Sequence, residues 1–307
     1  MMIIAIDGGT TNTRLTLVED GVILDRIKKR VGARSGRPGL ISAVREGISE
    51  LTGKNPGAVG RVAKIVLSGM IGSESGLREI PHIVAPAGVK ELENSLVTVS
   101  MPEVTGLPLV FIPGVKTFSD PGTKPLRELD IMRGEETELC GILEKTGVKR
   151  ATVILPGSHM KIVKTDGAGR IVSFRTTISG ELSRAAAENT ILSRSIKGVF
   201  PSHMDPEYLR LGFDYAAERG MSEALFKTRV QGNFLGVDPE RLYAFLLGAV
   251  LKDDVMSLRP DGDPVVIAGS EPFRSALDTL IQGEKIIIDD ETSETAAALG
   301  AWLIAGD

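Results

Sequence analysis

Cysteine and histidine are scarce in this sequence, and each scarcity excludes a class of site: 307 residues hold one cysteine and three histidines. Cys140 alone cannot form an internal disulfide or a cysteine-based zinc site, which suits a reducing compartment. His82, His159 and His203 are too far apart in the sequence to indicate a histidine-rich metal cluster. We therefore expect a cytoplasmic protein whose chemistry needs neither thiols nor a histidine cage.

Charge of one sign and long apolar runs are also scarce. Thirty-six basic and forty acidic residues leave a formal net charge of −4, and no basic cluster is dense enough to indicate a nucleic-acid partner. Apolar runs such as residues 245–251 are far too short to cross a bilayer. The start of the chain lacks the charged region of a signal peptide. We expect neither a nucleic acid nor a membrane as a partner.

Glycine is abundant instead, with 35 in the chain, and its placement indicates a repeated unit. In each copy a strand enters a glycine turn, a second strand leaves it, and an Asp-Gly hairpin leads to a third strand. The first copy is expected to have strands at 2–6, 13–18 and 22–27, and the second at 152–155, 159–163 and 170–174. This repetition favours two related halves.

The rest of the chain alternates helices and strands, which favours α/β architecture. Helices are expected at 39–51, 179–192, 206–219, 222–235, 239–255, 271–281 and 292–304, and further strands at 65–67, 264–268 and 285–288. The length favours two domains, and the proline- and glycine-rich stretch 113–130 is the best interdomain link. We expect domains at 1–120 and 121–307, with the closing helix 292–305 able to pack back on the N-terminal lobe.

The first glycine turn has the composition of a phosphate-binding motif. Asp7 stands at the end of a buried strand, where its carboxylate can reach a cation directly or through water. The glycines after it let backbone N–H groups approach an anion, and the hydroxyls and the amide that follow are donors for phosphate oxygens. We assign phosphate binding to Gly8, Gly9, Thr10, Thr11 and Asn12.

Two later glycine turns are candidates for binding the rest of a nucleotide. Gly157, Ser158, His159 and Lys161 hold the corresponding place in the second half, and two such turns facing each other could hold a polyphosphate. A histidine such as His159 also commonly has a purely structural role. Gly269-Ser270 follows a buried strand and could accept a base or ribose, although a tight strand-to-helix connection explains it equally well.

Arg133 and two glutamates begin a helix just past the expected link. Glu135 or Glu136 could accept the proton of an attacking hydroxyl, and Arg133 could hold a substrate carboxylate. Glutamates in the first turn of a helix also interact favourably with the helix dipole and can cap the helix, so a structural role is an equal alternative.

Several nucleotide and hydrolase signatures are missing from the sequence. It has no Gly-x4-Gly-Lys-Ser/Thr loop, and no Gly-x-Gly-x-x-Gly follows a strand. The protein-kinase motifs and the Gly-x-Ser-x-Gly elbow are absent too. These absences argue against Walker-type NTPases, dinucleotide-binding proteins, protein kinases and α/β-hydrolases.

The motifs, taken in order, resemble those of a known family. Residues 6–14 resemble the phosphate-binding motif of the actin, sugar-kinase and Hsp70 superfamily. More specifically, the chain resembles the 2-dehydro-3-deoxygalactonokinases at Met132–Thr137, Leu155–Lys161, Phe174–Leu182 and Ser68–Ser73, the last followed by Pro81 and Val84–Ala87. Met160 and Ile162 depart from the family, which usually has a small residue and a tryptophan there, at the pocket wall beside His159.

The resemblance implies an ATP-dependent kinase that converts 2-dehydro-3-deoxy-D-galactonate to its 6-phosphate in D-galactonate breakdown. It also implies two ribonuclease-H-like domains, each a mixed five-stranded sheet flanked by helices, with ATP and Mg²⁺ in the cleft between them. By the same resemblance, Asp7–Asn12 is the first phosphate motif, Pro156–Lys161 the second, and Gly269-Ser270 lies at the adenosine pocket.

We therefore expect a sugar-acid kinase in which positioning and charge neutralisation supply most of the catalysis. Asp7 is expected to hold Mg²⁺, directly or through water, and Glu135 or Glu136 to orient or deprotonate the attacking hydroxyl. The residues expected to bind the sugar acid are Arg133, Ser68, Met70, Gly72 and Ser73.

Two other functions are compatible with the same fold. The first is a phosphoanhydride hydrolase of the exopolyphosphatase type, since an Arg-Gly-Glu-Glu helix start vaguely resembles that group. The second is a nucleotide-gated scaffold, which would need self-association insertions that the sequence lacks. The sequence also leaves open a kinase for another sugar acid, and a homodimer as the oligomeric state.

Overall fold

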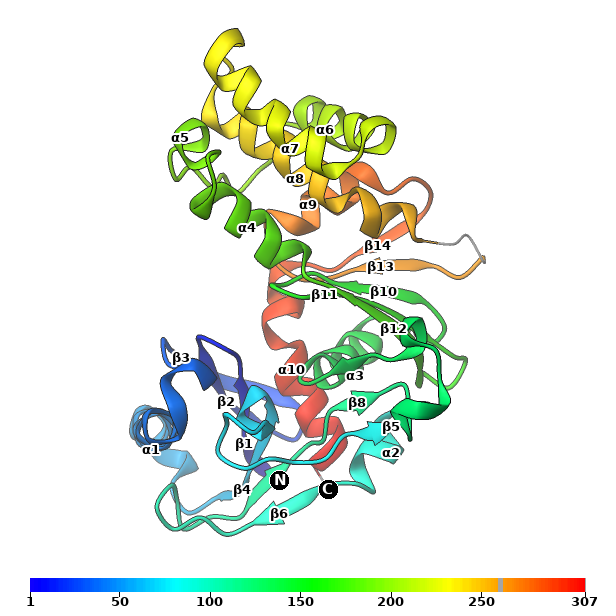
Figure 1. Cartoon of the computed structure of the whole chain (residues 1–307). Helices are drawn as coiled ribbons and strands as arrows, with labels where there is room; N and C mark the ends of the chain where they lie inside the picture. The colour runs from blue at the N-terminus through cyan, green and yellow to red at the C-terminus, as the bar shows by residue number, and fades with distance from the viewer. Residues whose placement is uncertain (259–261, 307) are drawn as a thin grey trace. The chain divides into compact units, whose positions relative to one another are not determined.

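The chain forms two compact units, and the computed structural model describes residues 1–258 and 262–306 (Figure 1). The first unit takes in Met1–Arg150, Lys164–Phe174 and the chain from Glu291 onward. The second takes in Ala151–Val163 and Arg175–Asp290. No helix in the described residues is both long enough and apolar enough to cross a membrane.

The main sheet of the first unit has six strands in the order β3-β2-β1-β4-β7-β6. Strands β1, β4 and β7 are parallel, while the β1–β2, β2–β3 and β6–β7 pairs are antiparallel. The bounds are β1 (Met2–Gly8), β2 (Thr13–Glu19), β3 (Val22–Lys29), β4 (Val62–Gly69), β6 (Val97–Val99) and β7 (Leu109–Phe111). The three parallel strands therefore end at one edge of the sheet.

Helix α1 (Gly36–Lys54) packs on β2 and β3 because its apolar residues recur at helical spacing. Leu40, Val44 and Leu51 are fully buried in one core with residues of β1 and β2. Gly47 allows the close approach, since a Cβ there would lie 2.8 Å from Leu15 Cδ2. The remaining short helices of this region are η1 (Ala33–Ser35), η2 (Pro56–Ala58), η3 (Met70–Gly72) and α2 (Val89–Glu93).

A small three-stranded sheet in the order β5-β8-β9 takes its central strand from the stretch predicted to be an interdomain link. Its strands are β5 (Ile83–Val84), β8 (Val115–Lys116) and β9 (Ile131–Met132), with η4 (Pro121–Thr123) and η5 (Leu126–Glu128) between the last two. The link prediction for residues 113–130 was wrong, because their backbone is hydrogen-bonded within the first unit, as in Thr117 N–H to Asp130 O.

Helices α3 (Glu135–Thr146) and α10 (Asp290–Ala305) approach each other closely in the first unit, the red and green helices of Figure 1. A Cβ on Gly141 would lie 2.0 Å from Ala296 O, and one on Gly300 would lie 1.8 Å from Thr137 O. The first unit thus extends past residue 120 and takes in residues 121–150 as well as the end of the chain.

The second unit contains most of a five-stranded sheet in the order β12-β11-β10-β13-β14. Its strands are β10 (Thr152–Leu155), β11 (Met160–Thr165), β12 (Ile171–Thr177), β13 (Val265–Ile267) and β14 (Lys285–Ile287). Strands β10, β13 and β14 are parallel. This order repeats that of β3-β2-β1-β4-β7, so the duplicated unit inferred from the glycine turns is present in the fold.

The helices of the second unit surround a core built on α8. They are α4 (Ser179–Asn189), α5 (Ser193–Ile196), α6 (Pro206–Arg219), α7 (Met221–Val230), η6 (Gln231–Leu235), α8 (Pro239–Met256) and α9 (Phe273–Leu280). The predicted fold class, mixed sheets flanked by helices, is confirmed, although the first sheet has six strands where five were expected.

Candidate active site

The first predicted phosphate turn, residues 8–12, joins β1 to β2 and is supported by backbone hydrogen bonds. Gly9 N–H donates to Asn12 O at 2.8 Å, and Ala33 N–H donates to Gly9 O at 3.1 Å. Gly32 makes this support possible, because a Cβ there would lie 2.5 Å from Thr11 N. The side chains of Thr10 and Thr11 stay exposed. The turn is therefore rigid on one side and presents hydroxyl donors on the other.

Asp7 lies beside the start of α3 because glycines let three segments meet. Asp7 and Gly8 pair in parallel register with Ser68 and Gly69 of β4. A Cβ on Gly69, at φ +81°, would lie 2.7 Å from Gly8 O, and one on Gly134 would lie 3.0 Å from Gly69 Cα. The Asp7 carboxylate is half-buried and accepts from Arg14 Nη1 at 2.8 Å.

The two predicted glutamates of α3 have different environments. Glu136 is fully buried, and its oxygens accept from Gly134 N–H at 2.8 and 2.9 Å. Burial, followed by the charge of Glu135, raises the pKa of Glu136 to about 7. Glu135 is half-buried and accepts from Arg133 N–H at 3.0 Å. Glu135 is thus the more accessible carboxylate, while Glu136 fixes the turn at Gly134.

Glu138 is an acidic residue of this region that the sequence analysis missed. Burial raises its pKa to about 8, and the next cause is the negative charge of Asp7. Glu138 stands three residues after Glu135, a spacing that places both on one face of a helix. This spacing was the sequence feature from which Glu138 could have been predicted to lie near Glu135.

Arg133 lies against the loop predicted to bind substrate. Its Nη2 donates to Ile80 O at 2.7 Å and contacts His82 Nδ1 at 3.1 Å. Its Nη1 is buried and has no hydrogen-bond partner. A Cβ on Gly72 would lie 3.3 Å from Nη1. A guanidinium group with a buried, unsatisfied donor is suited to an incoming anion.

The other residues of the predicted substrate loop differ in exposure. Ser68 is 3% exposed at the end of β4. Ser73 donates its hydroxyl to Met70 O at 2.6 Å, so it shapes the loop in this conformation. Gly72 and Met70 belong to the short helix η3. Within the loop, Gly72 is the residue that the structure brings next to Arg133.

The second phosphate turn lies in the second unit, between β10 and β11. Gly157, Ser158 and His159 are exposed, whereas Lys161 is 5% exposed and donates to Thr176 Oγ1 at 2.7 Å. His159 Nε2 lies 3.3 Å from a Glu181 carboxylate oxygen. The turn therefore exposes backbone and hydroxyl donors, while the Lys161 ammonium of the following strand is bound to Thr176.

Helix α4 supports this turn from its first residues. Glu181 N–H donates to Ser158 O at 2.9 Å. A Cβ on Gly180 would lie only 1.9 Å from Gly157 O. The helix start and the turn are thus in direct backbone contact, so a change in one displaces the other.

Gly269-Ser270 follows β13 and lies next to the second phosphate turn. Gly269 has φ +81°, and a Cβ there would lie 2.5 Å from Pro156 Cγ. Ala268 N–H donates to Ile154 O at 3.0 Å, which aligns the ends of the two strands. Met160 is fully buried, and Ile162 packs against the same core. The two departures from the family pattern are therefore core positions in this chain.

The donor set of the first unit suits a magnesium ion that is shared with phosphates. Among the described residues, no group of three or more His, Cys, Asp or Glu is arranged to hold a metal alone. Mg²⁺ is usually bound by one or two carboxylates together with substrate phosphates and water. Asp7, with the carboxyl groups of Glu135 and Glu138 nearby, fits that mode.

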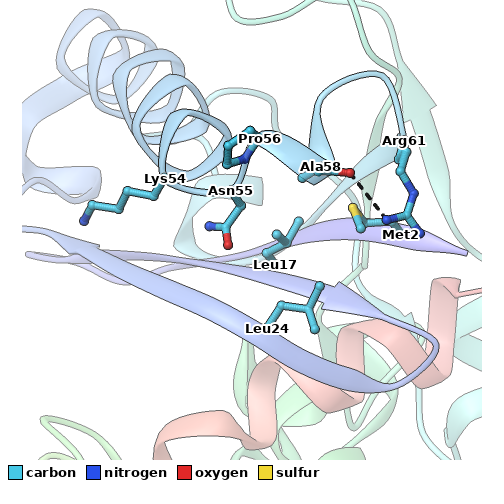
Figure 2. Close-up of a pocket in the computed structure, with 9 residues that line it drawn as sticks. Met2, Leu17, Leu24, Lys54, Asn55, Pro56, Ala58 and Arg61 are labelled. Atoms are coloured by element: carbon cyan, nitrogen blue, oxygen red, sulfur yellow. Dashed lines mark hydrogen bonds between the residues drawn. The ribbon is translucent and has the colours of Figure 1, made fainter.

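A cavity of about 280 Å³ lies elsewhere in the first unit (Figure 2). Its lining includes Met2, Leu17, Lys54 and Arg61, so it opens beside the beginning of β1, whereas Gly8 ends that strand. Both cations already have partners, Lys54 with Glu50 and Arg61 with Glu19. None of the predicted site residues lines this cavity.

The duplicated sheet order belongs to a fold that solved structures assigned as sugar kinases share. One solved structure of that type, assigned provisionally as an N-acetylglucosamine kinase of Porphyromonas gingivalis, has a TM-score of 0.50 at 15% identity and covers 100% of both chains. A second, from Sinorhizobium meliloti and assigned provisionally as a 2-dehydro-3-deoxygalactonokinase, has a TM-score of 0.75 at 24% identity, covering 99% of both chains. These likenesses establish the fold.

The sequence comparison gives the family. The model of the 2-keto-3-deoxy-galactonokinase family matches residues 7–304, and the chain belongs to that family. It is 27% identical over 271 residues to the 2-dehydro-3-deoxygalactonokinase of Escherichia coli K12, covering 83% of this chain and 80% of that protein. A Rhizobium meliloti protein named as a probable 2-dehydro-3-deoxygalactonokinase is 30% identical over 195 residues. That match covers 62% of this chain but only 58% of the relative. The resemblance found in the motifs is confirmed.

Proposed function

We propose that the chain is an ATP-dependent kinase that phosphorylates the terminal hydroxyl of 2-dehydro-3-deoxy-D-galactonate, giving the 6-phosphate in D-galactonate breakdown. The observation that carries the proposal is the grouping, within the first unit, of the Asp7 turn, the Glu135 carboxylate and the half-buried Arg133. A phosphoryl-transfer enzyme needs positioned phosphates, a positioned hydroxyl and charge neutralisation. Family membership agrees with this reading.

The phosphates of ATP would be bound mainly by backbone and hydroxyl donors. Residues 8–12 of the first unit would contact the terminal phosphates through N–H and O–H groups. Gly157 and Ser158 of the second unit would bind phosphate oxygens, and Lys161 of the following strand would add positive charge. Gly269-Ser270 would contact the adenosine. Asp7 would hold Mg²⁺, directly or through water, and the ion would supply charge neutralisation at the phosphates.

Glu135 is the better candidate to receive the proton of the attacking hydroxyl. Its carboxylate is partly exposed, whereas Glu136 is fully buried and its oxygens are engaged by Gly134 N–H. A group that accepts a substrate proton must come within hydrogen-bond reach of it. Glu136 would then act by holding the Gly134 turn and so the start of α3.

Arg133 would pair with the carboxylate of the sugar acid. Its Nη1 is buried without a partner, and among the described residues no carboxylate forms an ion pair with its guanidinium group. Burial lowers the pKa of Arg133, which indicates an incompletely compensated positive charge. A bound carboxylate would restore that compensation. Gly72 allows the close approach of Nη1, since a Cβ there would lie 3.3 Å from it.

A substrate panel tests the proposal. The purified protein is assayed for ADP release with 2-dehydro-3-deoxy-D-galactonate, with the corresponding gluconate derivative, and with neutral hexoses. We expect the galactonate derivative to give the highest kcat/KM and the neutral sugars to give no activity above background. Activity confined to a different sugar acid would change the substrate assignment, and activity on none of them would overturn the kinase proposal.

We also propose that the protein works in the cytoplasm. The phosphate donor is ATP, and the single cysteine, Cys140, is buried and unpaired. A thiol-containing protein without disulfides suits a reducing compartment. Fractionation of cells that express the protein measures this directly.

A further inference from the structure

We propose that His82 is a positioning residue that holds Arg133 in the orientation needed to bind the carboxylate of the substrate. The inference rests on the proposed function, since it concerns the same sugar-acid site. His82 reaches Arg133 from 51 residues away in the sequence.

The small sheet, β5-β8-β9, brings His82 and Arg133 to the same end of its strands. His82 immediately precedes β5, Gly114 immediately precedes β8, and Arg133 immediately follows β9. Strands β5 and β8 are parallel, and β9 is antiparallel to β8. The starts of β5 and β8 and the end of β9 must therefore lie at the same end of the sheet. In sequence these three residues stand in separate segments, and only the sheet unites them.

The ring of His82 is fixed by close packing on backbone. A Cβ on Gly114 would lie 2.6 Å from His82 Cδ2 and 2.9 Å from His82 Nε2. The same Cβ would lie 2.4 Å from Met132 O, so only glycine leaves room for the ring and for β9 together. Ile83 N–H donates to Gly114 O at 2.9 Å, which locks the neighbouring backbone. The imidazole therefore has little freedom to move away from Arg133.

The contact with Arg133 defines the protonation state of His82. A guanidinium group has only donors and stays charged, so at 3.1 Å from Arg133 Nη2 the His82 Nδ1 must accept. The imidazole proton therefore lies on Nε2. Nη2 is then held by two acceptors, His82 Nδ1 and Ile80 O.

This arrangement leaves Nη1 for the ligand. With Nη2 bound twice, the guanidinium plane cannot rotate freely, and Nη1 stays on the side of Gly72. A contact from a carboxylate oxygen to Nη1 depends on that fixed plane. Removing the Nδ1 acceptor should therefore weaken binding of the acid while leaving ATP binding and the phosphoryl-transfer step unchanged.

Two substitutions of His82 distinguish the effect of losing the Nδ1 hydrogen-bond acceptor from the effect of losing the packing of the ring. His82→Phe keeps a planar ring over Gly114 but removes the acceptor, and His82→Asn keeps an oxygen acceptor near the position of Nδ1. Val84→Thr, at an exposed position of β5, is the matched control. For each variant, kcat, the KM for ATP and the KM for the sugar acid are measured, together with the preference for the free acid over its neutral methyl ester. If His82→Phe does not fold, His82→Leu takes its place.

We expect His82→Phe to raise the KM for the sugar acid about ten-fold, as for the loss of one hydrogen bond to a charged group. The preference for free acid over ester should fall by a similar factor, with kcat and the KM for ATP within about two-fold. His82→Asn should restore much of the loss. Equal effects on acid and ester, or an unchanged KM for the acid in a folded variant, would overturn the inference. A wild-type protein inactive on every sugar acid would instead reject the proposed function, and this inference with it.

Discussion

At the scale of residues, the candidate site is a group of acidic side chains that differ in burial. Glu136 is fully buried and bonded to backbone, while Glu135, one residue earlier, remains accessible. Asp7 and Glu138 place two further carboxyl groups nearby, and the charge of Asp7 helps to raise the pKa of Glu138. Such crowding disfavours the ionised forms, and it suits a site that receives a cation and a protonated hydroxyl.

The two glutamates at the start of α3 should respond differently to neutralisation. Glu135→Gln should lower kcat by about 100-fold or more, the usual loss of a positioned general base. Glu136→Gln should lower kcat much less, because one amide oxygen still accepts from Gly134 N–H. Steady-state kinetics on both folded variants measure the difference. A larger loss of kcat in Glu136→Gln would assign the general base to Glu136. Full activity in both variants would show that neither glutamate is the base.

The raised pKa of Glu136 predicts a pH-dependent stability. Its value of about 7 in the folded state lies above its ordinary 4.5, so folding favours the protonated form. The associated stability is complete below about pH 4.5 and is lost as the pH rises through about 7, at most about 3 kcal/mol. Glu138, with a pKa of about 8, extends the loss to higher pH.

Glu136→Gln should therefore reduce the fall in melting temperature between pH 5 and pH 8. Thermal unfolding of the wild type and the variant at both pH values measures this effect. At pH 5 the two proteins should be similar, because the wild-type carboxyl is then mostly protonated. A variant whose melting temperature falls as steeply as that of the wild type would show that Glu136 is not the titrating group.

At the scale of elements, both phosphate turns depend on glycines that permit backbone contact. Helix α4 is the clearest case, since Gly180 lies against Gly157 O. Gly180→Ala should displace the second turn, raise the KM for ATP several-fold and destabilise the fold by about 1–3 kcal/mol, as overpacking does. Gly167→Ala is the control, because nothing lies within 4 Å of a Cβ there. Kinetics and thermal unfolding measure both effects, and an unchanged KM for ATP in Gly180→Ala would contradict the role of this turn.

The long elements were predictable from the sequence, and the short ones were not. Strands β1–β3 and β10–β12 alternate with glycine turns, and helices such as α8 have helical spacing over many residues. Strands β5, β8 and β9 are two residues long and exist only because they pair with each other. No periodicity marks such strands, so residues 113–130 were interpreted as a link.

The residues of the candidate site were only partly recognisable in the sequence. Asp7, Arg133 and Glu135 stand in motifs with recognisable chemistry, and the structure places them in one unit. The partnership of Arg133 with His82 and Ile80 depends on the pairing of the short strands. A lone histidine 51 residues from its partner carries no local signal.

At the scale of the whole molecule, one sheet order is used twice. In β3-β2-β1-β4-β7 and in β12-β11-β10-β13-β14, the central parallel strands end at glycine turns. Ligands of α/β sheets bind beyond the carboxyl ends of such strands. The duplication thus explains why the candidate phosphate-binding residues occur in two separated segments of the chain.

The central claim is that ATP turnover by this protein requires a sugar acid as acceptor. The most direct measurement is ADP formation by the wild-type protein with Mg²⁺ and ATP, in the presence and absence of 2-dehydro-3-deoxy-D-galactonate, with the sugar phosphate quantified in parallel. The account predicts one sugar phosphate for each ADP when the acid is present, and almost no ADP without it. ADP and free phosphate released at the same rate without the acid would contradict it and would identify a hydrolase.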